Sequence, residues 1–502
     1  MTDRTGIGGG FDQNVDVAGE ETPILAALTR AAHRIEVPLF VPGHKQGRLL
    51  PAALSLWIGA AAKLDLTELP GLDNLHQAEG CILASEALAA SHYGADWCLY
   101  SVNGSTAGVM AAMMACAAGG RVLMAGAFHQ SAWRGLVLAG AEPVMVSGRW
   151  DASRRVVRPP DVAEVERALA ADPHIRAVYV TSPTYAGVCA PVAELAQLAH
   201  RRGIPLIVDE AHGAHFGLHP DLPAHSIRAG ADVVIQSVHK MLPGLTQTAW
   251  VLGRGGRAPR ARVEEALSMV QSTSPSYLLL ASLDAAQAWL RHEGAAAAAR
   301  AIGAVATLWE VYPGQRLDDP LRHFVPMPGM GASRRLQAHL QDAGVWVEYA
   351  DPLGVLSLFG LAADERMVRR YLEALCNGLD DVRRTASQAD DGPGRGKETP
   401  GDSALTALIG QGQVRLCAAP REVQFAAREW LPPEEAVGRV AAGLVTPYPP
   451  GVPVLLPGQW IEGPVAEALS AWLATGYSVH GVDELGRIPV LRERGPSGVH
   501  HV

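Results

Sequence analysis

Two apolar segments of the sequence each end in side chains that can do chemistry. Residues 204–208 lead into Asp209, and residues 233–236 lead into a Ser-Val-His-Lys motif that ends at Lys240. A lysine amine can form an imine with pyridoxal phosphate, and a carboxylate can hold the pyridine nitrogen protonated, which makes the ring a better electron sink. Either residue alone would more often be a solvated loop side chain. Both together, after two predicted buried strands, predict a pyridoxal-phosphate site.

A third segment predicts a turn that binds phosphate. A strand-like stretch precedes Asn-Gly-Ser-Thr at 103–106, and an apolar helical stretch follows. Backbone N–H groups at the helix start, with the hydroxyls of Ser105 and Thr106, could hold a dianionic phosphate. Ser105 could equally be only an N-cap. Ser237 and His239 are placed to add further donors.

One imidazole also follows a predicted strand. His129 begins a predicted helix, just before Gln-Ser-Ala-Trp. Its flat ring could stack on the cofactor, and a histidine that merely begins the helix is the equal alternative.

The segments that must position these residues alternate between strand-like and helix-like patterns from about residue 81 to residue 253. Fully apolar strands separated by helices indicate a mostly parallel sheet covered on both faces, which is a three-layer α/β fold. Ligands of such folds bind at the carboxyl ends of the strands, where Asp209 and Lys240 are expected. The predicted strands are 97–102, 121–124, 143–146, 177–181, 205–208, 233–236 and 248–252, and the predicted helices include 106–118, 162–171 and 192–202.

Changes in composition divide the chain into predicted units. Residues 385–403 lack large apolar side chains and are rich in Gly, Pro, Asp and Ser, which is typical of a flexible linker. The expected units are a flexible arm (1–20), an N-terminal segment that contributes to a dimer and its active site (21–80), a cofactor-binding major domain (81–290), its α+β continuation (291–384), the linker (385–403), a small α+β C-terminal domain (404–490) and a tail (491–502).

Composition limits the classes of partner. The 502 residues carry a formal net charge of −9 and are 48% hydrophobic, so no basic patch favours nucleic acid. No apolar stretch has the length of a signal peptide core at the N-terminus or of a membrane span. Six cysteines without a C-x-x-C pair indicate a reduced compartment and no metal site. We expect a cytoplasmic protein that binds neither nucleic acid nor membrane.

A joint set of motifs carries a family resemblance. The motifs are NGST at 103–106, DEAHGAH at 209–215, SVHK at 237–240, STSPSYLLLASLD at 272–284, PLFVPGHKQG at 38–47, DLTELPGLDNLH at 65–76 and GRVAAGLVTPYPPGVPVLLPGQ at 438–459. Together they resemble the short-form bacterial ornithine/lysine/arginine decarboxylases, pyridoxal-phosphate enzymes of the aspartate-aminotransferase-like fold type I. The resemblance covers about residues 23–481. Because the pattern begins near residue 23, the N-terminal wing domain of longer members and their large rings are not expected.

The resemblance implies a role for each residue of the predicted site. Lys240 is implied as the Schiff-base lysine and Asp209 as the pyridinium partner, with His129 stacked on the ring and Ala211 packed on its other face. Active sites are implied at the subunit interface of a homodimer or a dimer of dimers. The implied cofactor-binding set is Gly104, Ser105, Thr106, His129, Asp209, Ala211, His212, Ser237, His239 and Lys240, with Ser272 or Thr273 reaching the phosphate of the neighbouring subunit.

The implied reaction converts a basic amino acid into an amine and CO2, with arginine favoured over lysine and ornithine. The proton returned to the α-carbon could come from Lys240, His212 or His239. Gln459 stands where related sequences usually have glutamate, which removes a carboxylate near the substrate entrance. A cationic tail needs acidic or carbonyl partners, for which the candidates are Asp65, Glu68, Asp73 and the segment around Tyr448.

Two alternatives stay open at this point. An aminotransferase, a lyase or an O2-dependent oxidase would use the same Lys240 and Asp209. Aminotransferases of this fold often hold the substrate α-carboxylate with a late arginine, and Arg322, Arg334 and Arg335 occur in the right part of the chain without a motif around them. A catalytically degenerate regulatory homologue is the second alternative.

Overall fold

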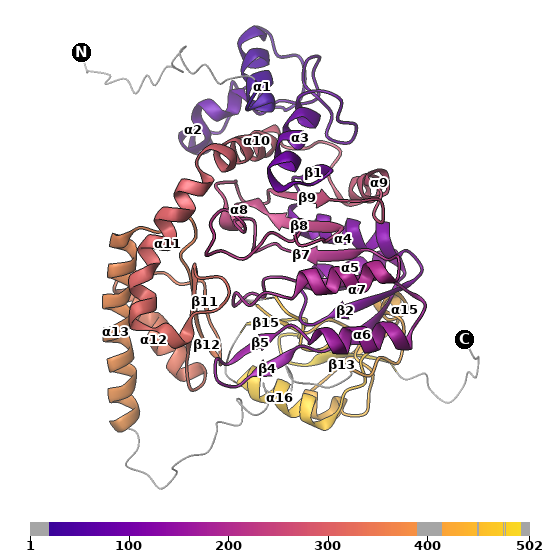
Figure 1. Cartoon of the computed structure of the whole chain (residues 1–502), viewed down its shortest axis with the longest axis vertical. Coiled ribbons are helices and arrows are strands. Elements are labelled where there is room, and N and C mark those ends of the chain that lie inside the picture. Colours follow the sequence, from indigo (N-terminus) through magenta and orange to yellow (C-terminus); the bar gives the residue numbers. More distant parts are fainter. Residues whose placement is uncertain (1–19, 389–413, 449–450, 475, 477, 493–502) are drawn as a thin grey trace.

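The computed structural model describes residues 20–388, 414–448, 451–474, 476 and 478–492. Figure 1 shows a large sheet in the middle of the molecule, the N-terminal segment above it and the C-terminal elements (yellow) below. The predicted arm and tail lie almost entirely outside the described residues.

In the described part of the chain, seven strands form the main sheet, and each of the seven predicted strands is present. All neighbouring strands are parallel except at β9, which runs antiparallel to both of its neighbours. The predicted three-layer, mostly parallel α/β fold is therefore confirmed. The order across the sheet is β1 (Trp97–Ser101), β9 (Ala249–Gly253), β8 (Val233–Ser237), β7 (Leu206–Asp209), β6 (Ile175–Thr181), β2 (Arg121–Ala125) and β3 (Glu142–Val146).

The strands are apolar throughout because both faces of the sheet are covered. Along β7, Ile207 packs into one hydrophobic cluster, whereas Leu206 and Val208 pack into the other, as the two-residue period of a strand requires. The first cluster includes α4 (Gly104–Ala117), α5 (Gln130–Ala139) and α9 (Arg260–Val270), and the second includes α6 (Val162–Ala171) and α7 (Val192–Arg201).

The N-terminal segment packs on one end of this domain. Helix α1 (Pro23–Arg34) and α3 (Cys81–Tyr93) contact α10 (Tyr277–His292). Between them lie α2 (Ala52–Ile58) and the short helix η1 (Gly59–Lys63). Much of the apolar surface between α1 and α3 is solvent-exposed in the single chain: Val37, Leu39, Val41, Leu49, Leu56 and Trp57.

The predicted α+β continuation of the major domain contains an antiparallel sheet of its own. Strands β10 (Arg322–Pro326), β12 (Gly354–Leu358) and β11 (Tyr349–Ala350) pair antiparallel and do not join the main sheet. The predicted boundary at residue 290 falls inside α10. Three further helices, α11 (Gly294–Val311), α12 (Met330–Asp342) and α13 (Glu365–Gln388), complete this part. The two sheets nevertheless share one hydrophobic core, to which Val325, Leu336 and Val355 belong.

The predicted linker begins too early. Helix α13 continues to Gln388, so residues 385–388 are helical. This short stretch contains neither Gly nor Pro, and the Thr385 hydroxyl donates to the Asp381 carbonyl one turn earlier, so nothing ends the helix there. The remainder of the predicted linker lies outside the described residues.

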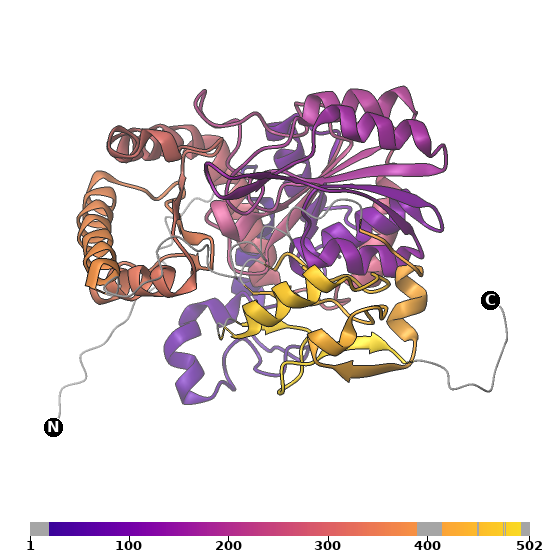
Figure 2. The same ribbon diagram turned by 90° about the horizontal axis from the view of Figure 1, so that it is seen from below.

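The C-terminal elements form the predicted small α+β domain. Their apolar core continues into the second sheet through Phe324, Tyr349 and Leu356, and α15 packs on α5. Figure 2 shows these yellow elements along one side of the large domain and α11 to α13 grouped apart from them. The elements are α15 (Pro420–Phe425), β13 (Arg428–Leu431), η3 (Pro433–Ala436), β14 (Thr446–Pro447), α16 (Gly463–Ala474), β15 (Val479–His480) and β16 (Ile488–Leu491).

Candidate active site

A cavity of about 760 Å³ opens at the carboxyl edge of the main sheet. The main sheet, the second sheet and the C-terminal domain all contribute to its wall, so it is a site between structural units. Eleven of the sequence-predicted residues line it: Gly104, Ser105, Thr106, His129, Asp209, Ala211, His212, Ser237, His239, Lys240 and Tyr448.

Lys240 projects from the one-turn helix α8 (Val238–Met241), which directly follows β8. Its Nζ lies 2.9 Å from Nε2 of His212. Burial lowers the pKa of Lys240, partly opposed by the charge of Asp209. Burial also holds the pKa of His212 well below its usual range, helped by the nearby charge of Lys240. The pair therefore favours a neutral imidazole and a lysine that loses its proton more easily, which makes the amine a better nucleophile.

Asp209 ends β7, the parallel neighbour of β8. The carboxylate is 3% exposed, and both of its oxygens are held: Oδ2 accepts from the Tyr179 hydroxyl at 2.9 Å and Oδ1 accepts from the Ala211 N–H at 3.1 Å. Two donors, one to each oxygen, fix the direction of the carboxylate. The sequence analysis did not predict Tyr179. The feature that could have indicated it is its position on β6, two residues before Thr181, which is the register partner of Asp209.

The predicted phosphate turn lies at the start of α4. Gly104 adopts φ +72°, a left-handed conformation that a side chain would strain. The N-cap is Asn103, and its side chain makes no capping hydrogen bond, so the reading of Ser105 as the N-cap is wrong. The Gly104 N–H donates to the Gln247 carbonyl at 2.8 Å, so the amides that follow it in the first turn of α4 are the ones an anion can use. Ser237 Oγ donates to Ser105 Oγ at 2.8 Å, which brings the two hydroxyls together.

His129 is the N-cap of α5, as predicted. Its Nδ1 accepts from the Ser131 N–H at 3.2 Å and lies 2.9 Å from Ser131 Oγ, so the ring orientation is fixed. Burial lowers the pKa of His129, which favours a neutral ring. Gly451 from the C-terminal domain approaches this ring, because a Cβ there (at φ +82°) would stand 3.2 Å from His129 Cδ2.

These residues fit pyridoxal phosphate. The cavity holds a buried lysine, a carboxylate locked by two donors, an uncapped helix start with two hydroxyls and the small side chain of Ala211. In the described structure His212 Nδ1 is also buried without a hydrogen-bond partner, which indicates that a ligand or water satisfies it. Among the described residues no group of three or more His, Cys, Asp or Glu is placed to hold a metal ion.

Two cavity residues escaped the sequence analysis. Tyr185 packs its ring 4.5 Å from that of His212, and its hydroxyl donates to Glu348 Oε1 at 2.5 Å. Glu348 comes from the loop before β11, more than a hundred residues away, and no motif around it gave a signal.

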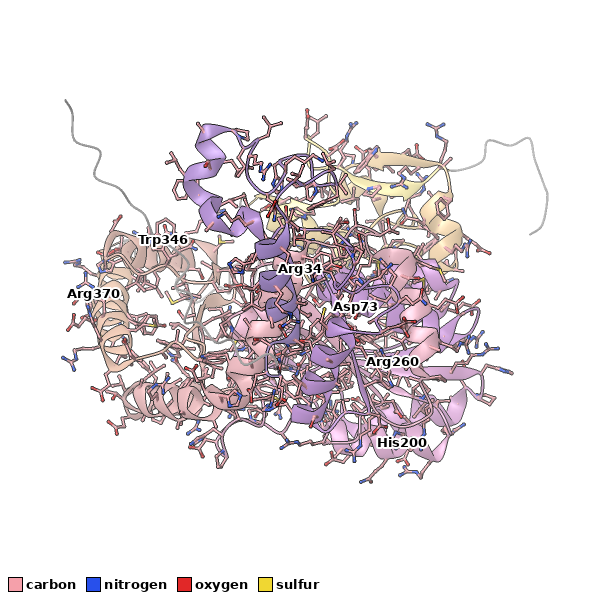
Figure 3. The ribbon with its side chains drawn as sticks, turned by 90° about the horizontal axis from the view of Figure 1, so that it is seen from above. Arg34, Asp73, His200, Arg260, Trp346 and Arg370 are labelled. Carbon is pink, nitrogen blue, oxygen red and sulfur yellow. The ribbon has the colours of Figure 1, made fainter. Side chains whose placement is uncertain are left out.

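Five predicted residues lie outside this cavity of the single chain. Asp73 accepts from the backbone amides of Gly80 and Ile82 at 2.7 and 3.0 Å, which makes it a cap for α3, beside which Figure 3 shows it. The other four either have local partners or are exposed near the N-terminal segment: Asp65, which pairs with His44 at 3.1 Å, Glu68, Ser272 and Thr273.

The late arginines are not placed to hold a substrate carboxylate. Arg322 is fully buried, and its guanidinium donates to the carbonyls of Tyr185 and His212 at 2.8 and 2.6 Å and to Asp319 at 2.7 Å. Arg334 and Arg335 do not line the cavity, and Arg334 donates to the Gly476 carbonyl. Arg322 instead positions the backbone on either side of the Lys240 site.

The fold and the site define a pyridoxal-phosphate enzyme of the aspartate-aminotransferase-like class. Residues 22–308 match the family model described as Orn/Lys/Arg decarboxylase, major domain, and residues 414–480 match that of its C-terminal domain. The chain therefore belongs to the Orn/Lys/Arg decarboxylase family, the pyridoxal-phosphate-dependent decarboxylases of basic amino acids, as the motifs predicted.

Individual relatives agree with this family. The chain is 30% identical to an arginine decarboxylase of Bacillus subtilis, covering 94% of this chain and 98% of the relative, and 30% identical to an arginine decarboxylase of Bacillus anthracis, covering 95% and 98%. The structure of the constitutive lysine decarboxylase of Escherichia coli superposes with a TM-score of 0.76 at 20% identity, covering 95% of this chain and 82% of that one. The latter likeness supports the fold.

Proposed function

We propose that this enzyme decarboxylates arginine, releasing agmatine and CO2, with Lys240 and Asp209 as the central catalytic pair. The observation that carries the proposal is the convergence of Lys240, His212 and Asp209 in one cavity with an uncapped helix start. The preference for arginine rests on the two Bacillus relatives described as arginine decarboxylases.

The residues would divide the work as follows. Lys240 would hold the cofactor through its amine. Asp209, oriented by Tyr179, would hold the proton on the pyridine nitrogen, and His129 and Ala211 would contact the ring. Ser105, Thr106, Ser237 and His239 hold the phosphate with the amides of α4. Bound there, pyridoxal phosphate supplies an electron sink for the bond to the departing carboxylate.

The proton of the last step has a candidate donor in the Lys240–His212 pair. The two nitrogens lie 2.9 Å apart, so one proton can move between them. Burial, which lowers the pKa of both groups, makes each a stronger acid when protonated. Lys240, protonated at Nζ, could then deliver this proton to the α-carbon.

We also propose a homodimer with shared active sites. The exposed Leu39, Leu56 and Trp57 of the N-terminal segment form an apolar surface of the kind that subunits cover. Ser272 and Asp73 lie beside the same segment, so a second copy could bring this region to a neighbouring cavity.

Six free cysteines support a reduced, cytoplasmic location. No helix of the described residues has the length and apolar character to cross a membrane.

The test is a product assay with the holoenzyme and arginine, lysine or ornithine separately, in air and under nitrogen. We expect agmatine and CO2 from arginine in both atmospheres and no product from the Lys240→Ala variant. A keto acid product would contradict the proposed decarboxylase activity and indicate an aminotransferase. A product that forms only in air would indicate an oxidase. A protein that takes up no cofactor would indicate a degenerate homologue.

A further inference from the structure

Among the described residues, three carboxylates line the active-site cavity: Asp209, Glu348 and Asp351. Within one chain, the partner of a cationic substrate tail has to be a carboxylate that neither holds the cofactor nor is already used in hydrogen bonds that shape the fold. Asp209 is committed, because the proposed function assigns it to the pyridine nitrogen and its two oxygens already accept from Tyr179 and Ala211.

The Asp351 side chain already accepts hydrogen bonds from the backbone of its own turn. Its Oδ1 accepts from the backbone amides of Leu353 and Gly354 at 2.8 and 2.9 Å, so it shapes the turn between β11 and β12. It is 7% exposed, and burial raises its pKa to about 6, partly opposed by the charge of Arg155. A buried turn residue with a cation already near it is a poor partner for a second cation.

Glu348 differs from both. Its side chain remains exposed, and no basic side chain of the described residues lies within ion-pair distance of it. Its Oε1 accepts from the Tyr185 hydroxyl at 2.5 Å, which orients the carboxylate and leaves Oε2 for a ligand. Burial raises the pKa of Tyr185, so this phenol stays a donor.

The position of Glu348 relative to the reacting amine is also suitable. Contacts run from Lys240 to His212 at 2.9 Å, from His212 to the Tyr185 ring at 4.5 Å between centroids, and from Tyr185 to Glu348. The charge of Glu348 also acts on Lys240, because it helps to raise the pKa that burial lowers. Glu348 thus lies in the same cavity as Lys240 and is separated from it by two side chains, those of His212 and Tyr185.

The C-terminal wall of the cavity offers no competing carboxylate at its most suggestive position. Gln459 is 3% exposed, and its Oε1 accepts from the Leu456 N–H at 3.0 Å. A neutral amide in this place cannot balance a substrate cation, so the anion must come from another side of the cavity.

We propose that Glu348, held by Tyr185, binds the distal cation of the substrate and sets the preference for a guanidinium or ammonium tail. This inference rests on the proposed function. A carboxylate accepts the planar guanidinium in a bidentate pair, whereas a neutral tail gives it nothing to bind.

The first test compares arginine with norleucine, an amino acid with a neutral tail, as substrates of the holoenzyme. Glu348→Gln should lower kcat/KM for arginine by about 10- to 100-fold, mainly through KM, because a charge-assisted hydrogen bond is lost. The low rate with norleucine should not change. Glu348→Asp should retain part of the effect, and the exposed Glu310→Gln on α11 serves as the control. An equal loss for both substrates would overturn the proposal, because Glu348 would then act only by positioning Tyr185.

The second test is independent of turnover. The holoenzyme is titrated by calorimetry with agmatine and with butylamine, which share a primary amine but differ in the distal guanidinium. The natural protein should bind agmatine more tightly, and Glu348→Gln should remove most of that difference. An unchanged difference in the variant would refute the role of Glu348. If no basic amino acid loses CO2 in the product assay, the proposed function fails, yet this titration still decides whether Glu348 recognises the cation.

Discussion

At the scale of single residues, the reactive groups of the site are oriented by neighbouring side chains that contact them. Tyr179 directs Asp209, His212 contacts Lys240, and Arg322 holds the backbone carbonyl of His212. Each partner comes from a different part of the chain than the residue it orients. His212 belongs to the motif at 209–215, whereas Tyr179 and Arg322 lie outside the named motifs, so the chemistry of those motifs depends in part on side chains that they do not contain.

Replacing Tyr179 with phenylalanine tests the orientation of Asp209. The variant loses a hydrogen bond to a charged acceptor, which is worth about 1.5 to 3 kcal/mol. We expect a fall in cofactor affinity of about 10-fold or more, measured by titration of the apoenzyme with pyridoxal phosphate. Tyr100→Phe is a matched control, because Tyr100 is also a buried strand tyrosine with a bonded hydroxyl but lies away from the cavity. Equal affinity in Tyr179→Phe and the natural protein would contradict this role.

A buried carboxyl predicts a pH dependence of stability. Burial raises the pKa of Asp284 to about 6. Its folded-state pKa thus exceeds its unfolded-state value, so the folded protein binds the proton more tightly, and this contribution to stability is lost as pH rises through about 6. Relative to Asp284→Asn, the natural protein should lose roughly 2 kcal/mol of unfolding free energy between pH 4.5 and pH 7.5. Urea unfolding at several pH values measures this, and a pH-independent difference would contradict it.

At the scale of elements, strand ends and helix starts place the reactive groups. Asp209 and Lys240 meet because β7 and β8 are parallel neighbours, and the phosphate donors gather because α4 begins at the same edge of the sheet. The start of α4 requires a left-handed backbone conformation, which Gly104 adopts.

Gly104→Ala should therefore weaken the phosphate site. At φ +72° a Cβ costs about 1 to 2 kcal/mol, so we expect a lower melting temperature and weaker cofactor binding. Gly303→Ala is the matched control, since Gly303 lies inside α11 with open space around a Cβ, and alanine there should be neutral or stabilising by up to about 1 kcal/mol. Unchanged cofactor binding in Gly104→Ala would show that this turn does not carry the phosphate.

At the scale of the whole molecule, a single chain leaves part of its predicted site unassembled. Ser272 and Thr273 are exposed and do not line the cavity, and Asp65, Glu68 and Asp73 also lie outside it. The N-terminal segment beside them presents exposed apolar side chains. A second copy that covers this surface would account for both observations.

Charging this surface should separate the subunits. Trp57 is 87% exposed in the single chain, and Trp57→Asp would place an unpaired carboxylate in the proposed interface, which is strongly unfavourable there. We expect the mass measured by analytical ultracentrifugation to fall to that of a monomer, with loss of activity. Trp346→Asp is the control, because Trp346 is 79% exposed on a different part of the molecule (Figure 3). A dimer that survives Trp57→Asp would place the interface elsewhere.

The sequence by itself determined the features that are local or periodic. Apolar strands and intervening helices predicted the main sheet, and residues directly after strands predicted Asp209, Lys240 and the turn at Ser105, because a parallel sheet gathers its carboxyl ends at one edge. The tertiary structure decided which distant residues meet them. Tyr179 reaches Asp209 from β6, and Tyr185 and Glu348 reach the cavity from two separate loops. Pairing across a sheet or between domains leaves no spacing pattern in the chain. The tertiary structure also decided that the second sheet is separate from the first, because strand partners depend on packing and not on the pattern of any one strand.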